Sequence, residues 1–326
     1  MSRVVVFDET GAPEVLHIVD EPVADPGAGE VRIEVEAVGV NRLDQMMRAG
    51  MSPRPIRLPH ARLGIEATGT IEALGSGVEG WATGDAVIVT AVPEMDVHGT
   101  YAEHIVVPAD RIIARPAGLD AVGAAALWVA YSTAYGALVE KAGMRPGHHV
   151  LITAASSAVG LAAIQLAAQI GAIPLAVTRH AAKERALLAA GAAAVIVTDR
   201  DDVVRATHRH TNGAGADIVL DSVLGPGLAD LADAAKRFSG TLVGVGWLDP
   251  RPAPFPSNPI TMIRYMSFEH TLDPVVVHRI AAFLTAGIRT GALRPTIDTV
   301  FALDDIVAAH HYLEKGHHIG KIVATV

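Results

Sequence analysis

VLITAASSAVGLAAIQLA, the stretch from Val150 to Ala167, places an apolar run, a turn of small residues and a helix-forming segment in succession. This order is typical of the first strand and helix of a parallel sheet that binds a dinucleotide, where small turn residues let backbone N–H groups approach a phosphate. The familiar glycine spacing falls on Ala154, Ser157 and Gly160, of which only the last is a glycine. The motif alone is weak, so its interpretation depends on the surrounding sequence.

The residues after this stretch repeat the same alternation. Apolar strand candidates and helix candidates follow one another through about five rounds, and the first two helices are expected to end at Gly171 and Gly191. We therefore predict an α/β fold with a doubly wound parallel sheet, and Tyr265–Thr271 is the candidate for a sixth strand.

The two ends of the chain have a different pattern. Short β-branched runs broken by glycine and proline predict a compact, partly open β-barrel in the N-terminal third, and the helix and strands after Pro274 are expected to return to it. We expect one domain from residues 1–122 and 271–326 and a second from residues 123–270, bridged by a helix over residues 121–141.

Composition excludes several classes of protein. The chain has 326 residues, a formal net charge of −9 and no cysteine, which rules out disulfides, thiolate nucleophiles and cysteine-ligated zinc. An acidic chain has no general attraction for nucleic acid. Residues 121–139 and 150–178 are uncharged, but they are rich in small residues, as in globular α/β packing. With no apolar leader, we expect a soluble, cytoplasmic protein without membrane or nucleic-acid partners.

The residues after the second strand indicate which dinucleotide binds. An NAD site usually places Asp or Glu about 20 residues past the turn, whereas this chain carries Thr178, Arg179 and, one turn later, Lys183. Because a guanidinium attracts a 2′-phosphate that a carboxylate would repel, we predict NADPH. The alternative is that Arg179 and Lys183 are solvated surface cations without a role in binding. The expected pyrophosphate contacts, in which the serines could also act as helix caps, are Ala154, Ser156, Ser157, Ala158, Val159 and Gly160.

Further motifs, in this order and spacing, resemble the zinc-independent, zeta-crystallin-like quinone oxidoreductase branch of the medium-chain dehydrogenase/reductase superfamily. They are GVNRLD (39–44), LGIEATGTIEALGSGV (63–78), GDAVIV (84–89), GTYAEH (99–104), STAYGAL (132–138), ADIVLDSV (216–223), GTLVGVG (240–246) and GKIV (320–323). The resemblance implies a GroES-like catalytic domain, an inserted Rossmann domain, a groove for the nicotinamide, and a homodimer joined through the Rossmann-sheet edge near Tyr265–Thr271.

The resemblance also implies roles for individual residues. Asn41 is expected beside the nicotinamide or its ribose, with turn capping as the alternative. Asp44 is interpreted as a helix-start residue and Glu66 as structural. The other expected cofactor contacts are Thr133 near the nicotinamide, Val223, Val245 and Gly246 at strand ends, and Lys321 over the phosphates. The alternative for Thr133 is a buried helix hydroxyl bonded to its own backbone. For the strand-end residues the alternative is a purely structural strand end, and for Lys321 it is a solvated lysine.

No metal site is expected. Zinc-dependent relatives carry a Gly-His-Glu ligand segment, and the matching triplet here is Gly64-Ile65-Glu66, whose isoleucine cannot ligate a metal. The histidine pairs are predicted to have surface or capping roles. They are His148/His149, His208/His210, His310/His311 and His317/His318.

The predicted reaction is hydride transfer from NADPH to a quinone or to the β-carbon of an α,β-unsaturated carbonyl. Asn41, Ser52 and Tyr131 are the catalytic candidates, and for proton delivery Ser52, Tyr131 and solvent stay open. A tyrosine that can face the substrate in relatives is absent, because Gly50–Pro53 reads Gly-Met-Ser-Pro. Two alternatives remain: an enoyl reductase acting on an acyl thioester or biosynthetic intermediate, and a non-catalytic NADPH-binding protein.

Overall fold

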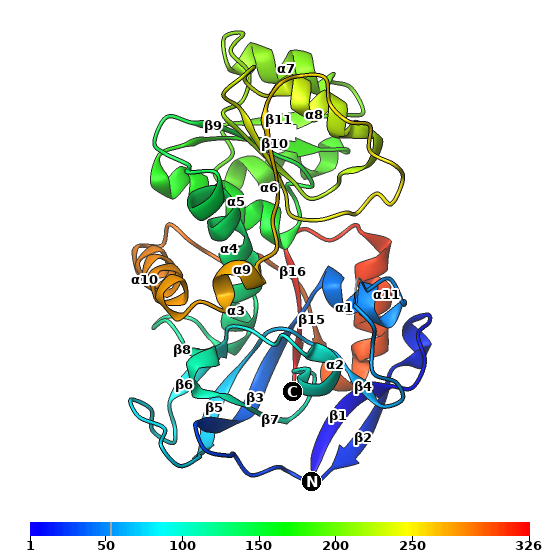
Figure 1. The fold of residues 1–326 in the computed structure, drawn as a ribbon, viewed down its shortest axis with the longest axis vertical. Helices are drawn as coiled ribbons and strands as arrows, with labels where there is room; N and C mark the ends of the chain where they lie inside the picture. Colours follow the sequence, from blue (N-terminus) through cyan, green and yellow to red (C-terminus); the bar gives the residue numbers. More distant parts are fainter. Residues whose placement is uncertain (53) are drawn as a thin grey trace. The chain divides into compact units, whose positions relative to one another are not determined.

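The chain forms two compact units in the computed structural model, which describes residues 1–52 and 54–326 (Figure 1). Unit 1 comprises Met1–Val129, Thr271–Arg289 and Pro295–Val326. Unit 2 comprises Ala130–His270 and Thr290–Arg294. Both ends of the chain therefore belong to one unit, and the middle of the chain folds as the other.

Unit 2 is built on a parallel sheet, which confirms the predicted doubly wound fold. Among the described residues the strand order is β11-β10-β9-β12-β13-β14, and every neighbouring pair is parallel. The chain order reverses between β9 and β12, the place where open parallel sheets bind ligands. The strands are β9 (His149–Ile152), β10 (Ile173–Thr178), β11 (Ala194–Val197), β12 (Ile218–Asp221), β13 (Thr241–Gly244) and β14 (Thr261–Arg264).

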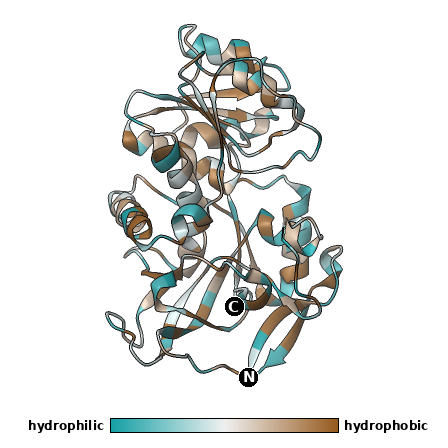
Figure 2. Ribbon diagram, viewed as in Figure 1, coloured by the Kyte–Doolittle hydropathy of each residue, from teal (hydrophilic) through white to brown (hydrophobic). Residues whose placement is uncertain are grey.

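Helices cover the strands of this sheet. Helix α5 packs on β9 and β10, while α6 and α7 contact β11. Most strand residues are apolar and buried. Helix α7 contains both hydrophilic and hydrophobic residues (Figure 2), and its Arg209 and His210 are exposed. The helices are α4 (Trp128–Tyr135), which begins in unit 1, the π-helix η3 (Gly136–Lys141), α5 (Ala158–Ile170), η4 (Ala181–Lys183), α6 (Glu184–Ala189), α7 (Val203–His210), η5 (Gly225–Gly227), α8 (Leu228–Ala234) and α9 (Phe268–Thr271).

The sixth strand is not the predicted one. Strand β14 ends at Arg264, and the expected strand Tyr265–Thr271 instead contains helix α9. Tyr265 is buried and its hydroxyl lies 3.1 Å from Nδ1 of His270. Residues five apart in a strand are separated by about 17 Å. This side-chain contact therefore requires a compact turn, and the prediction was wrong.

The predicted bridging helix over residues 121–141 is also interrupted, by a break after α3 (Ala121–Ala125) and a change to π-helix at Gly136. Two side chains of unit 1 explain the break. The Val129 N–H donates to Glu66 Oε2 at 2.9 Å instead of continuing the helix, and the Trp128 indole N–H donates to the Thr90 carbonyl at 2.6 Å.

Unit 1 is a β structure completed by the C-terminal strands. The larger sheet has the order β15-β16-β3-β5-β6-β8, with β7 also pairing with β3, and a smaller sheet has the order β2-β1-β4. Its end strands β15 and β8 do not pair with each other among the described residues, so the sheet stays open. The strands are β1 (Ser2–Phe7), β2 (His17–Glu21), β3 (Glu30–Val40), β4 (Ala61–Arg62), β5 (Ala67–Leu74), β6 (Ala86–Val89), β7 (His104–Pro108), β8 (Ile112–Ala114), β15 (Ile297–Ala302) and β16 (Lys321–Thr325).

One register in this sheet positions a functional side chain. Strand β16 runs antiparallel to β3 and pairs Ile322 with Val40 and Val323 with Gly39, so Lys321 lies level with Asn41.

The helices of unit 1 besides α3 are η1 (Pro13–Val15), α1 (Arg42–Arg48), α2 (Met95–His98), η2 (Ala109–Arg111), α10 (Pro274–Thr290), whose last residue belongs to unit 2, η6 (Leu303–Asp305) and α11 (Ile306–Lys315). None of the helices in the described ranges is long and apolar enough to cross a membrane.

Candidate functional site

The turn between β9 and α5 has the geometry of a phosphate-binding loop. Ala154 adopts a φ of +44°, a left-handed conformation that glycine usually supplies. Ser157 is the N-cap of α5 and its Oγ accepts the Gly160 N–H at 3.1 Å. The N–H groups of Ala158 and Val159 belong to the first helical turn, where donors have no partner within the helix. The serine that replaces the middle glycine of the motif therefore acts as a helix cap.

Gly160 cannot be replaced by a larger residue without disturbing this turn. A Cβ built at Gly160 would lie 2.6 Å from both Cα and O of Ala155. Real side chains do not tolerate such contacts with backbone atoms, so a glycine is needed for the helix to pack this closely on the turn. The close packing leaves a turn that is lined by backbone atoms.

Cationic side chains follow the end of β10, as predicted. Thr178 is buried at the strand end, Arg179 is exposed, and Lys183 donates from Nζ to Ser156 Oγ at 3.0 Å. Lys183 therefore reaches the phosphate loop itself, whereas Arg179 points to the solvent beyond the strand.

An acidic residue that the sequence analysis missed lies beside these cations. Asp199 follows β11, and its Oδ2 is 2.8 Å from Nδ1 of His180, while its N–H donates to the Arg179 carbonyl at 3.3 Å. Because β10 and β11 are parallel neighbours, their carboxyl ends meet at the same edge of the sheet. The sequence feature that could have revealed Asp199 is the pair Thr198-Asp199, which directly follows the third strand along the chain of this sheet.

The ends of β12 and β13 form a second backbone-lined edge. The Val223 N–H donates to Asp221 Oδ1 at 2.9 Å and the Val223 carbonyl accepts the Asp249 N–H at 3.0 Å. The Val245 N–H donates to the Asp221 carbonyl at 2.8 Å. A Cβ at Gly246 would lie 2.5 Å from the Ser222 carbonyl oxygen. The backbone N–H and carbonyl groups of Val223 are thus engaged within unit 2.

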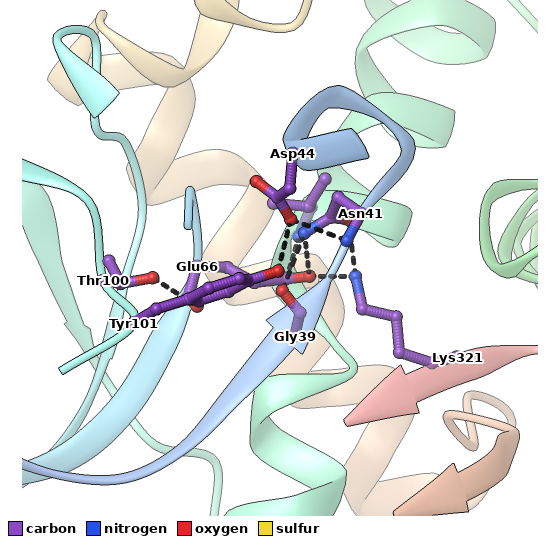
Figure 3. Close-up of polar contacts among 8 residues, drawn as sticks. Gly39, Asn41, Asp44, Glu66, Thr100, Tyr101 and Lys321 are labelled. Carbon is purple, nitrogen blue, oxygen red and sulfur yellow. Dashed lines mark hydrogen bonds and ion pairs between the residues drawn. The ribbon is translucent and has the colours of Figure 1, made fainter. Parts of the chain in front are cut away.

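A buried polar cluster in unit 1 surrounds Asn41 (Figure 3). The Asn41 Nδ2 group donates to the Gly39 carbonyl at 3.0 Å and to Glu66 Oε1 at 3.1 Å, and Asn41 Oδ1 accepts from Lys321 Nζ at 2.7 Å. Lys321 and Glu66 form an ion pair and are 3% and 1% exposed. Lys321 was expected over the cofactor phosphates or in solvent; the structure places its ammonium group between Glu66 and Asn41 instead.

Asp44 lies in the first turn of α1, in agreement with its interpretation as a helix-start residue. Its Oδ2 accepts the Asn41 N–H at 2.7 Å and the Tyr101 hydroxyl at 2.8 Å. Burial raises the pKa of Asp44 to about 7, although both hydrogen bonds act in the opposite direction. Burial, together with the neighbouring Asp44 carboxyl, raises the pKa of Tyr101 well above its usual value.

The remaining predicted site residues lie outside these clusters. Tyr131 is buried on α4, donates its hydroxyl to Gln165 Oε1 at 2.8 Å, and has a pKa raised by that burial. Gln165 in turn accepts the Arg294 N–H at 2.8 Å. Ser52 is half-buried and accepts the Arg54 N–H at 3.2 Å, and Thr133 is half-buried on α4. The neighbouring Pro53 lies outside the described residues.

Within residues 1–52 and 54–326, no group of three or more His, Asp or Glu side chains is arranged to hold a metal ion. The predicted surface role of the histidine pairs is wrong for His310. It is fully buried on α11, neither ring nitrogen has a hydrogen-bond partner among the described residues, and burial lowers its pKa to about 3. It packs edge-on against the Tyr101 ring.

Comparison with known proteins identifies the family. Residues 27–117 match the alcohol dehydrogenase GroES-like domain, and residues 190–323 match the family described as zinc-binding dehydrogenase. A quinone oxidoreductase of Lama guanicoe is 31% identical over 99% of this chain and 97% of its own length. The chain belongs to the quinone oxidoreductases of the medium-chain dehydrogenase/reductase superfamily, which are oxidoreductase enzymes.

Two further comparisons bear on cofactor and substrate. The structure of the Escherichia coli quinone oxidoreductase in complex with NADPH superposes over 100% of both chains with a TM-score of 0.90 and 27% identity. An erythronolide synthase of Saccharopolyspora erythraea is 34% identical over 94% of this chain, which corresponds to only 8% of that synthase.

Proposed function

We propose that this protein is a zinc-independent oxidoreductase that uses NADPH to reduce a quinone or an α,β-unsaturated carbonyl. The observation that carries the proposal is the pairing of a glycine-dependent phosphate loop with cations at the end of the next strand. Gly160 leaves the loop open to a pyrophosphate, and Arg179 and Lys183 supply positive charge where an NAD site would carry a carboxylate.

The roles of the chain's residues follow from these positions. The first turn of α5 would bind the pyrophosphate through the N–H groups of Ala158 and Val159. Lys183 would bridge the loop to the adenosine phosphates, and Arg179 would hold the 2′-phosphate. Val223, Val245 and Gly246 would present the walls against which the cofactor lies. When bound, NADPH supplies the hydride.

Asn41 is the residue that we assign to the nicotinamide end of the cofactor. Its amide is held in place by hydrogen bonds with Gly39, Glu66 and Lys321. Preorganised polar groups of this kind orient a reacting ring without reorganisation at the moment of reaction. Tyr131 is already engaged with Gln165 in a buried site. We therefore favour Ser52 or solvent over Tyr131 as the proton source.

Independence from zinc is proposed on side-chain chemistry. Ile65 stands where zinc-dependent relatives have a histidine ligand, and the sequence has no cysteine. The adjacent carboxylate of Glu66 is already neutralised by Lys321.

A second candidate is an enoyl reductase that acts on an acyl thioester or biosynthetic intermediate. The observation in its favour is the likeness to a segment of the erythronolide synthase, which spans 94% of this chain. The segment after β13 also exposes Leu248 and Phe255, at 46% and 94%, as an apolar surface for a long substrate would.

We also propose a cytoplasmic homodimer. Strand β14 is the edge of the parallel sheet and exposes Met262, so a second copy can extend the sheet there. We therefore expect the interface at Thr261–Arg264, directly before the predicted segment Tyr265–Thr271. A cytoplasmic setting agrees with a sequence that contains no cysteine. Light scattering of the purified protein and cell fractionation test the two proposals.

The function is tested by following NADPH and NADH oxidation against panels of quinones, enones and enoyl thioesters, with and without a chelator. We expect turnover with NADPH, a preference for one acceptor class, and no effect of chelation. Turnover restricted to enoyl thioesters would favour the second candidate. Failure of calorimetry to detect either coenzyme, or activity that chelation abolishes and zinc restores, would overturn the proposal.

A further inference from the structure

The amide of Asn41 can take only one orientation. Lys321 has only donors on Nζ, so the Asn41 atom beside it must be the carbonyl oxygen. The Gly39 carbonyl and the Glu66 carboxylate only accept, so the Asn41 atom facing them must be the NH₂ group. These three partners therefore decide which side-chain atom of Asn41 is the oxygen and which is the nitrogen, an assignment that is usually ambiguous.

This arrangement uses almost all of the amide's hydrogen-bonding capacity. Both hydrogens of Nδ2 have acceptors at 3.0 Å and 3.1 Å, and one lone pair of Oδ1 faces Lys321. What remains is a single acceptor position on Oδ1, on a side chain that is only partly buried. A ligand group that hydrogen-bonds to Asn41 must therefore be a donor.

The groups that impose this orientation are themselves held in place. Glu66 Oε2 accepts the Val129 N–H at 2.9 Å, which leaves Oε1 for Lys321 and Asn41. The carboxylate fits only because residue 39 is glycine, since a Cβ there would lie 2.3 Å from Glu66 Oε1. The pairing of β16 with β3 brings Lys321 to the same level from the other end of the chain.

We propose that the buried Lys321–Glu66 ion pair is a positioning device that locks the orientation of the Asn41 amide. In this orientation the Asn41 carbonyl oxygen is the free site, and it accepts a hydrogen bond from a ribose hydroxyl or the carboxamide N–H of the nicotinamide nucleoside. The proposal rests on the function proposed above. Lys321 and Glu66 act through Asn41 and do not touch the cofactor. The pair is neutral overall, so it orients the amide without adding net charge to the site.

If the ion pair were purely structural, removing it would have different effects. Two variants separate the structural role from the positioning role. Lys321→Met leaves the Glu66 carboxylate buried without its counter-ion, so both stability and activity should fall. Lys321→Met combined with Glu66→Gln removes both charges, so most of the lost stability should return. In this double variant the new side-chain amide at position 66 can donate from its NH₂ group to Asn41 Oδ1, and the Asn41 amide is free to turn over.

The experiment measures Tm, NADPH affinity by calorimetry, and kcat with the best acceptor for five proteins: the wild type, Lys321→Met, the double variant, Asn41→Ala and Lys315→Met. Lys315 is an exposed lysine on α11 with no ion pair among the described residues, so Lys315→Met is the matched control and should behave as the wild type. We expect the double variant to regain a Tm within about 4 °C of the wild type. Its kcat or NADPH affinity should stay reduced by about tenfold or more, close to that of Asn41→Ala.

Recovery of both Tm and turnover in the double variant, or full activity of Asn41→Ala, would overturn the positioning role. These outcomes are distinct from failure of the proposed function, which would appear as absence of NADPH binding by the wild type and would overturn both. A primary isotope effect on kcat with deuterated NADPH that rises in the double variant would support the role, because misplacing the nicotinamide slows hydride transfer itself.

Discussion

Thr153 directly follows β9 and Asp221 is the last residue of the neighbouring parallel strand β12, and the Thr153 hydroxyl donates to Asp221 Oδ1 across 2.6 Å. The contact ties β9 to β12 where the strand order reverses. Asp221 is fully buried and also accepts the N–H groups of Val223 and Leu224 at 2.9 Å each. One carboxylate therefore organises the loop that borders the expected cofactor site, including Leu224, whose φ of +57° is unusual for a leucine.

Replacing Asp221 with alanine should destabilise unit 2 and weaken NADPH binding. The buried Thr153 hydroxyl and the half-buried N–H groups of Val223 and Leu224 would lose their acceptor, at a cost of about 3 kcal/mol in the free energy of unfolding. Chemical denaturation measures this cost. Thr153→Val is the comparison, because it keeps the acceptor for Val223 and Leu224; it also removes the hydroxyl that accepts the Ser222 N–H at 3.0 Å, so it should cost about 1–2 kcal/mol. Equal costs for the two variants would show that the loop contacts contribute little.

Arg179→Ala and Lys183→Met should separate recognition of the 2′-phosphate from recognition of the pyrophosphate. Arg179 is exposed beyond β10, so its loss should weaken NADPH binding by about tenfold and leave NADH nearly unchanged. Lys183 contacts Ser156 of the phosphate loop, so its loss should weaken both coenzymes. Arg185→Ala, on the exposed face of α6, serves as the control. Equal losses for both coenzymes in Arg179→Ala would contradict this assignment.

Asp199→Asn should strengthen NADPH binding. The Asp199 carboxylate lies 2.8 Å from the His180 ring, and the Asp199 N–H donates to the carbonyl of Arg179, the residue that we assign to the 2′-phosphate. Removing a negative charge there should raise NADPH affinity by about two- to threefold, and added salt should reduce the difference because the pair is exposed. Calorimetric titrations at two ionic strengths measure the effect, with NADH as the internal control. A similar gain for NADH would place Asp199 away from the extra phosphate.

Gly160→Ala should impair folding of the phosphate loop. The new Cβ would meet Ala155 backbone atoms at 2.6 Å, and such overpacking costs about 1–3 kcal/mol. Gly227→Ala is a matched control in the same unit, because a Cβ there has no neighbour within 4 Å. Thermal unfolding and NADPH titration should show losses only for Gly160→Ala. Normal NADPH affinity in that variant would mean that the cofactor does not lie on this turn.

Stability should decline between about pH 4 and pH 7 in a way that depends on Asp44. Burial raises the folded-state pKa of Asp44 to about 7, so in this window the folded protein keeps a proton that the unfolded chain has released. The contribution is therefore fully present below the unfolded pKa and is lost as the pH rises through the folded value. Asp44→Asn, which is neutral at every pH, should flatten the dependence. Tm profiles of both proteins from pH 4 to pH 9 test this, and parallel profiles would count against it.

The sequence sufficed for features that depend on local pattern. Alternating apolar runs and helix-ending glycines predict the parallel sheet, because hydrophobic periodicity and capping act over a few residues. Helix α5 ends at Gly171, where φ is +88°, and this ending was read directly from the residue type. The cations Arg179 and Lys183 were likewise visible from their spacing after the phosphate turn.

Short strands and interrupted helices were harder to predict. The segments Thr261–Arg264 and Tyr265–Thr271 have similar strand-forming composition, and the contact of Tyr265 with His270 decides that only the first is a strand. The helix over residues 121–141 breaks because Glu66, far away in the sequence, accepts the Val129 N–H. Local propensity contains no information about either contact.

The sequence by itself determined the kind of fold, the family resemblance and the preference for a phosphorylated coenzyme, since each depends on residue types at short spacing. Only the tertiary structure decided the partner of Lys321, which is Glu66, 255 positions earlier, and hence the orientation of the Asn41 amide. The reason is physical: a buried charge needs a counter-ion, and which one it meets is set by the pairing of β16 with β3.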